Sequence, residues 1–143
     1  MVASADNDHV FRARLPATPP SIGVFREQLR RWLEQCEVSS AQVFDIVLAC
    51  SESLTLVIEE QPTKRALVVD VEATIDDGDL VLTTRDYGLW HETHAHYEEE
   101  PLGLSLMRAL MDSVELERHR DGQRITFRKR VVIANGQQRA LPL

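Results

Sequence analysis

One carboxylate lies within a stretch that otherwise has the apolar spacing of a buried helix. Val43, Val47, Cys50 and Leu54 recur every three or four positions, and Glu52 lies between the last two. A helix that is apolar on most of its surface packs between other elements, where an unpaired charge is costly. A glutamate in that setting can accept a proton from a hydroxyl group as a general base. We therefore treat Glu52 as a candidate functional residue, with an ion-paired structural carboxylate as the alternative.

An aspartate and two glycines form a second group of candidates. Asp86 ends a stretch typical of a strand, and Gly88 follows it two positions later. Glycine allows the backbone to pass close to a ligand, and a carboxylate at the end of a strand can accept a hydrogen bond from one. Gly103 and Leu104 begin a stretch with helical spacing, where the N-terminal amides favour an anion. The alternatives are an ordinary turn and an ordinary helix start.

Three histidines form a further cluster. His91, His94 and His96 lie with Glu92 in an acidic stretch that has no helical period and no cysteine. Zinc sites need about four ligands held in a fixed geometry. We therefore favour a polar lid over a metal site, predict no metal ligands, and keep zinc binding as the alternative.

Composition places the chain among globular proteins and excludes some classes of partner. Its 143 residues, 43% hydrophobic and 27% charged, suit one domain with a real core. A formal net charge of -7 argues against nucleic acid as a partner, because binding phosphate needs clustered positive potential. Cys36 and Cys50 lie on apolar helical stripes and are expected to be buried, reduced thiols.

The sequence also gives an expectation about membranes and location. The first ten residues lack the basic and apolar regions of a signal peptide. We also expect that no apolar run is long enough to cross a bilayer. We therefore expect a cytoplasmic protein that does not contact a membrane.

The elements that carry the candidate residues follow from hydrophobic periodicity. Alternation predicts a strand over residues 10–15, and helical spacing predicts a helix from Ser21 to about Cys36, with Ser21 as its cap. A second helix is expected from Ser39 or Ser40 to about Glu60. Further strands are expected at 66–75, 80–85, 114–118 and 125–131, with a third helix at about 104–112.

This order of elements predicts an α+β fold. We expect a two-layer α/β sandwich in which three helices cover one face of a mixed, mostly antiparallel sheet of about five strands. The domain should span residues 10–133, between a disordered N-terminus at 1–9 and a flexible tail at 134–143. The long loop before Gly103 is of the kind that is usually functional or disordered.

Three segments together resemble the ATP-binding boxes of the gyrase and histidine-kinase ATPases, the Bergerat fold. Residues 48–56 are similar to the N box, residues 85–90 to the D-x-G box, and residues 102–112 to the second glycine box with its helix. Their order and spacing, over about residues 11–131, are similar to those of the anti-sigma-factor serine/threonine kinases. The resemblance therefore implies a histidine-kinase-like ATPase fold.

The resemblance also implies roles for the candidate residues. Asp86 would accept the exocyclic amine of adenine, with Gly88 beside the ligand. Gly103 and Leu104 would lie at the phosphates of ATP, below the lid. Glu52 would be the catalytic base that acts on a protein serine.

Partners are implied in the same way. Arg26, on the first helix, matches a family position that faces partners. Those partners would be a sigma factor and a STAS-type anti-anti-sigma protein, with a serine phosphatase in the same pathway. Members of the family are commonly homodimers.

Four positions depart from the family pattern, namely Leu56, Gln123, Pro101 in place of the glycine that opens the second box, and Glu60 in place of a histidine. Leu56 stands where the N box has the asparagine that holds Mg²⁺, and leucine cannot ligate a metal. Gln123 replaces a threonine that commonly supports the adenine pocket. Two functions therefore follow from the sequence: an anti-sigma serine kinase that uses ATP, and a degenerate module that regulates partners by protein binding with weak or no nucleotide binding.

Overall fold

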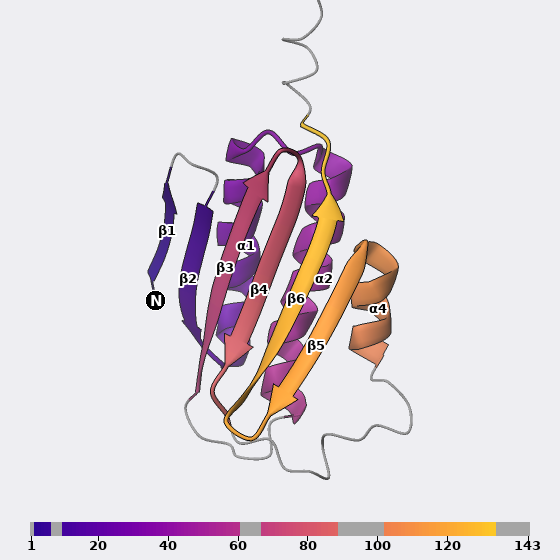
Figure 1. Ribbon diagram of the computed structural model, residues 1–143. Helices are drawn as coiled ribbons and strands as arrows, with labels where there is room; N and C mark the ends of the chain where they lie inside the picture. The colour runs from indigo at the N-terminus through magenta and orange to yellow at the C-terminus, as the bar shows by residue number, and fades with distance from the viewer. Residues whose placement is uncertain (1, 7–9, 61–66, 89–101, 134–143) are drawn as a thin grey trace, which may run out of the picture.

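The computed structural model describes residues 2–6, 10–60, 67–88 and 102–133 of the chain. In this part of the chain, one sheet carries three helices on a single face (Figure 1). The α+β sandwich predicted from the sequence is therefore confirmed. In chain order the elements are β1 (Val2–Asp6), β2 (Val10–Pro16), α1 (Pro19–Gln35), α2 (Ser40–Glu60), β3 (Val68–Asp76), β4 (Asp79–Asp86), α4 (Leu102–Leu110), β5 (Ser113–His119) and β6 (Gly122–Arg130).

The sheet differs from the expectation in two respects. Its strand order is β1-β2-β3-β4-β6-β5, and every pairing between these strands is antiparallel, so it is not a mixed sheet. Val2–Asp6 forms a sixth strand that pairs with β2, so the prediction of a disordered N-terminus is wrong for this segment. Backbone pairing along the edge of β2 supplies the order that the polar sequence does not indicate.

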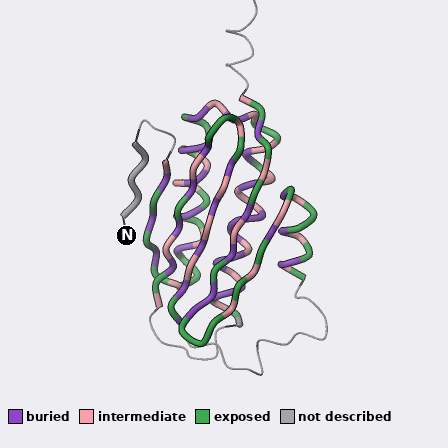
Figure 2. Tube along the Cα trace, viewed as in Figure 1, coloured by how far each residue is buried: buried purple, intermediate pink, exposed green. Residues whose placement is uncertain are grey.

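Alternation of buried and exposed residues explains how the strands meet the helices. Buried and exposed residues alternate along β2 (Figure 2). Its buried residues are Phe11, Ala13 and Leu15, which the sequence places on one side of the strand. The ring of Phe11 lies 5.7 Å from that of Trp32, which packs β2 against α1. β3 and β4 continue the same buried face toward β6.

α2 is the central helix of the layer, because it packs against both α1 and α4. Ile46, Ala49, Cys50 and Leu54 are fully buried, as expected for a helix that is apolar nearly all round. The expectation that no segment is long and apolar enough to cross a membrane is wrong for Ser40–Glu59, which passes on length and composition. Half of that segment is buried inside the fold, as in the core helix of a globular domain.

The start of α1 differs from the prediction, whereas the two cysteines are buried as expected. α1 begins at Pro19 with Thr18 at its N-cap, so Ser21 is not the cap but a buried residue within the first turn. Proline suits the first turn, where its missing N–H costs nothing. Cys36 and Cys50 are both free and buried, and burial raises the pKa of the Cys36 thiol to about 11.

Replacing Phe25 by alanine should lower the free energy of unfolding by about 3–5 kcal/mol, because a fully buried ring of α1 is lost. Phe44→Ala is the matched control. Phe44 is 68% exposed on α2, so its removal should change stability by less than about 0.5 kcal/mol. Urea unfolding followed by circular dichroism measures both, and equal losses would contradict the packing of α1.

Candidate functional site

Asp86 is a buried carboxylate at the last position of β4. Its side chain faces the helices and the residue is 1% exposed. The Oδ1 atom accepts a hydrogen bond from the N–H of Gly88 at 3.0 Å, so the chain turns back over the carboxylate as soon as the strand ends. Gly88 is itself buried. The structure thus brings two of the predicted residues together and holds a hydrogen-bond acceptor in a fixed orientation.

β6 places Gln123 directly opposite Asp86. The two residues are partners in the antiparallel register, and Gln123 is 2% exposed. Its Oε1 accepts hydrogen bonds from Nε and Nη2 of Arg118, at 2.9 and 2.6 Å. A Cβ atom at the neighbouring Gly122 would overlap the backbone oxygen of Asp86. Gly122 therefore allows the close approach that sets Gln123 beside Asp86.

Glu52 and Gly103 meet where α2 passes the start of α4. A Cβ atom on Gly103 would lie 3.1 Å from Oε2 of Glu52, so the glycine and the carboxylate lie in close contact, and a larger residue would require the carboxylate to shift by a few tenths of an ångström. Within the described residues, no hydrogen bond or ion pair engages Glu52. The structure therefore brings the Glu52 carboxylate to the first turn of α4.

These residues gather at one end of the molecule. The end of β4, the start of α4 and the last turns of α2 all lie at the lower end in Figure 1. Leu104 belongs to α4, but its side chain is 2% exposed and packs in the core, so it offers a ligand only its backbone. The predicted lid, with His91, His94, His96 and Glu92, lies outside the described residues.

Arg26 belongs to α1, which packs against α2 on the side away from α4. Its Nε donates a hydrogen bond to Oγ of Ser51 at 3.1 Å, which ties α1 to the residue before Glu52. Arg26 also lines a groove of about 490 Å³ between α1 and α2, together with Val43, Val47 and the exposed Phe44. The structure thus separates the predicted partner-binding residue from Asp86 and places it on an apolar groove.

The described residues fit a nucleotide better than they fit its metal. A buried acceptor at Asp86 and a buried, unsatisfied Nε2 at Gln123 form a polar pair that a base could meet. Leu56 is 6% exposed and belongs to the core, one turn from Glu52. Across the described residues, no three acidic, histidine or cysteine side chains cluster as metal ligands would. No step through Mg²⁺ is therefore derived.

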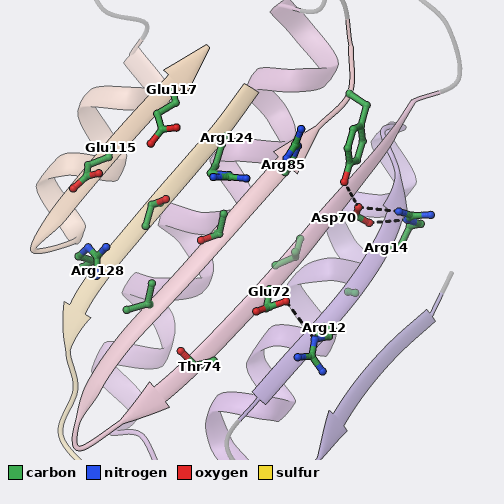
Figure 3. Close-up of a pocket in the computed structure, with 16 residues that line it drawn as sticks. Arg12, Arg14, Asp70, Glu72, Thr74, Arg85, Glu115, Glu117, Arg124 and Arg128 are labelled. Carbon is green, nitrogen blue, oxygen red and sulfur yellow. Dashed lines mark hydrogen bonds and ion pairs between the residues drawn. The ribbon is translucent and has the colours of Figure 1, made fainter. Parts of the chain in front are cut away.

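The opposite face of the sheet is open and charged (Figure 3). A hollow of about 760 Å³ lies over it, lined by both arginines and carboxylates. Asp70 accepts hydrogen bonds from Nε and Nη2 of Arg14, at 2.6 and 2.9 Å, and from the Tyr87 hydroxyl at 2.6 Å. The bonds from Arg14 hold the pKa of Asp70 below its usual value. This network depends on the register of β2 and β3, which the amino-acid sequence alone does not reveal.

Comparison with known proteins agrees with the fold and with the motifs. Residues 15–129 match the family described as the histidine kinase-like ATPase domain. The chain therefore belongs to that family, and the resemblance predicted from the three segments is confirmed. No curated protein matches the chain.

Two solved structures show how far the likeness reaches. The RsbU and RsbW domains of Rv1364c from Mycobacterium tuberculosis align with a TM-score of 0.70 and 25% identity, over 85% of this chain. This chain spans only 32% of the length of that one. The histidine kinase domain of the blue-light activated kinase EL346 from Erythrobacter litoralis aligns with a TM-score of 0.55 and 17% identity, over 82% of this chain and 63% of that one. The second likeness supports the fold alone.

Replacing Gly122 by alanine should destabilise the protein by about 1–3 kcal/mol, because the new methyl group would overlap the backbone of Asp86. The control is Gly23→Ala in α1, where no atom lies within 4 Å of the new methyl group. Alanine there should stabilise by about 0.5–1 kcal/mol. Thermal unfolding measures both changes, and the same sign for both would refute the close approach of β6 to β4.

Proposed function

We propose that this chain is an anti-sigma-factor-like regulator that binds ATP and phosphorylates a serine on an anti-anti-sigma partner. The observation that carries the proposal is the buried, oriented Asp86 at the end of β4, in a chain of the histidine kinase-like ATPase family. The likeness to a structure with an RsbW domain supports the anti-sigma type over other members. The protein would act in the cytoplasm.

Asp86 and the first turn of α4 would hold the two ends of the nucleotide. Asp86 would accept the exocyclic amine of adenine, and the bond from Gly88 keeps its carboxylate in place. The backbone amides of Gly103 and Leu104 lie in the first turn of α4, where the helix dipole favours phosphate. ATP supplies the phosphoryl group when it is bound.

Glu52 would act on the serine of the partner. Its carboxylate lies beside Gly103 and has no ion pair within the described residues, so it can accept the proton of a hydroxyl group. Nearness to the first turn of α4 would put this proton acceptor next to the bound phosphates.

Partner binding would use the groove between α1 and α2. Arg26 borders the groove between α1 and α2, and a sigma factor or a STAS-type anti-anti-sigma protein would contact it there. The similar Mycobacterium chain carries an RsbU domain as well as an RsbW domain, which supports a serine phosphatase in the same pathway. A homodimer is part of the same proposal.

A second candidate function rests on Leu56. With a core leucine in place of the metal-binding asparagine, the chain would regulate its partners by binding alone and would hold nucleotide weakly or not at all. The two functions differ in whether ATP binds with Mg²⁺ and whether phosphate reaches a partner.

ATP should bind to the full chain with one-to-one stoichiometry in calorimetry. Asp86→Asn should weaken that binding about tenfold or more, because a charged acceptor of a buried hydrogen bond is lost. Asp121→Asn, at an exposed turn, is the matched control and should bind ATP as the unmodified chain does. Absence of ATP binding would reject the first function, and absence of phosphate transfer to any cognate anti-anti-sigma protein would favour the second.

Leu56→Asn should raise the affinity for Mg-ATP relative to ATP without metal, because it restores an oxygen ligand one turn after Glu52. Leu56→Ala removes the same side chain without adding a ligand and should leave the ratio unchanged. Both variants lose buried leucine atoms, so each is measured below its own unfolding temperature. An unchanged ratio in Leu56→Asn would show that Leu56 does not limit metal binding.

A further inference from the structure

The described part of the chain ends beside the start of α2, at the upper end of the molecule in Figure 1. Ile133, the last described residue, forms a β-bridge with Val38. The N–H of Ser39 donates to the carbonyl oxygen of Val132 at 2.9 Å, and the N–H of Val132 donates to Oε1 of Gln42 at 2.6 Å. These contacts fix the point from which the following residues leave the fold.

That point lies at the groove between α1 and α2, because Val38 is part of the groove lining. The groove has a volume of about 490 Å³, and its apolar wall along α2 is made by Val43, Phe44, Val47 and Leu48. The ring-bearing Phe44 is 68% exposed. Apolar side chains gathered on a surface in this way are typical of a site that another segment covers.

The sequence continues for ten residues beyond Ile133. Residues 134–143, for which the sequence predicts a flexible tail, lie outside the described residues. They contain no acidic residue, and they divide into a mostly polar part at 134–139 and the apolar run Ala140-Leu141-Pro142-Leu143. The apolar run therefore follows a polar spacer that starts beside the groove.

The spacer is long enough to bring the apolar run to the groove wall. From Ser40 to Val47, α2 rises by roughly 10 Å, at about 1.5 Å per residue. Seven extended residues, 134–140, span at most about 23 Å. Because the run is attached beside the groove, its effective concentration there is on the order of millimolar. A separate molecule would need a comparable concentration in solution to compete at equal affinity.

Charge at the groove agrees with this occupant. Glu34 and Glu37 line the groove at the end of α1, close to the bridge made by Val38. Arg139, the one charged residue of the segment, comes directly before the apolar run. A segment that enters from Ile133 would thus carry its cation past the two carboxylates, where opposite charges attract.

We propose that residues 140–143 dock in the groove between α1 and α2 of the same chain, with Leu141 and Leu143 against Phe44 and Val47. Arg26 lines the same groove, so the docked segment would cover the surface proposed above for partner binding. The docking itself does not rest on the proposed function, whereas its competition with a partner does.

Disulfide trapping on the full chain tests the docking. Val47→Cys is combined with Ala140→Cys, and oxidised glutathione drives formation of the bond, which needs Cα atoms within about 7 Å. Val81→Cys with Ala140→Cys is the matched control, because Val81 is also a half-buried valine but lies on the outer face of the sheet. The groove pair should form its disulfide at least about tenfold faster than the control pair. Equal rates would show that the segment does not occupy the groove.

The control position is within reach of the segment, and the native thiols are accounted for. Val81 pairs with Arg128, so roughly 17 Å of extended chain separates its partner from Ile133. Cys36 and Cys50 are buried, and burial raises the pKa of both thiols, which keeps them from reacting as thiolates. Ala140→Cys alone should therefore form no disulfide within the chain. A bond formed in this variant as fast as in the groove pair would overturn the placement at Val47.

Substitution of one leucine tests the apolar contact. Added to the groove pair, Leu141→Asp should slow bond formation to the rate of the control pair, because burying a carboxylate against an apolar wall is costly. Gln137→Asp introduces the same charge in the polar spacer and should keep the fast rate. Equal effects of the two substitutions would contradict the proposed contact.

The size of the trapped species distinguishes one chain from two. Docking within a chain gives a disulfide-linked monomer on a non-reducing gel, in a yield that does not depend on protein concentration. A disulfide-linked dimer whose yield rises with concentration would show that the groove takes a second copy, and would reject docking within the chain.

Partner binding separates this inference from the proposed function. If the groove takes a partner, Leu141→Asp in the otherwise unmodified chain should bind a cognate anti-anti-sigma protein about tenfold more tightly, because the groove is then open. Fast trapping with unchanged partner affinity would leave the docking standing and reject the groove as the partner surface. Slow trapping would reject the docking and leave the proposed function standing.

Discussion

Apolar packing of α2 against the inner face of the sheet is the interaction on which the rest of the structure depends. Ile46, Ala49 and Leu54 are fully buried, and the strands present a continuous apolar face to them. Burial of this area supplies the main favourable free energy for folding. Because α1 and α4 both pack on α2, the same helix also sets where Arg26 and Gly103 lie. Ser51 contacts Arg26 of α1, whereas Glu52, the next residue, lies beside Gly103 of α4.

The polar groups of the candidate site occur where this core ends. Asp86 and Gln123 extend rows of inward-facing residues that are mostly apolar along β4 and β6. A carboxylate and an amide can be buried there because backbone and arginine donors meet some of their needs. A ligand can make the hydrogen bonds that these donors do not make. Within the part of the chain that the structure describes, Nε2 of Gln123 has no hydrogen-bond partner.

Much of the fold follows from periodicity, and some of the site does not. Alternation in residues 10–15 and helical spacing around Cys50 place β2 and α2 correctly, since burial of one face decides both. β1 has no such pattern and is held by backbone pairing, so the sequence does not reveal it. The motifs make Glu52, Asp86 and Gly103 candidates, and the structure places Glu52 beside Gly103. The bond from Arg118 to Gln123 depends on the register of β5 and β6, which periodicity leaves undetermined.

The pairing of β4 with β6 runs without interruption from Asp79 and Arg130 to Asp86 and Gln123. Side chains of a strand alternate between faces, so this ladder also fixes which residue of β6 meets the core. One added residue in the middle of β6 would turn Arg124 inward beside Asp86 and send Gln123 to the solvent face. Whether an amide or a cation lies beside Asp86 therefore depends on the number of residues in β6 as well as on their identity. Length change within β6 is therefore a route by which such a domain can acquire a different ligand without altering its fold.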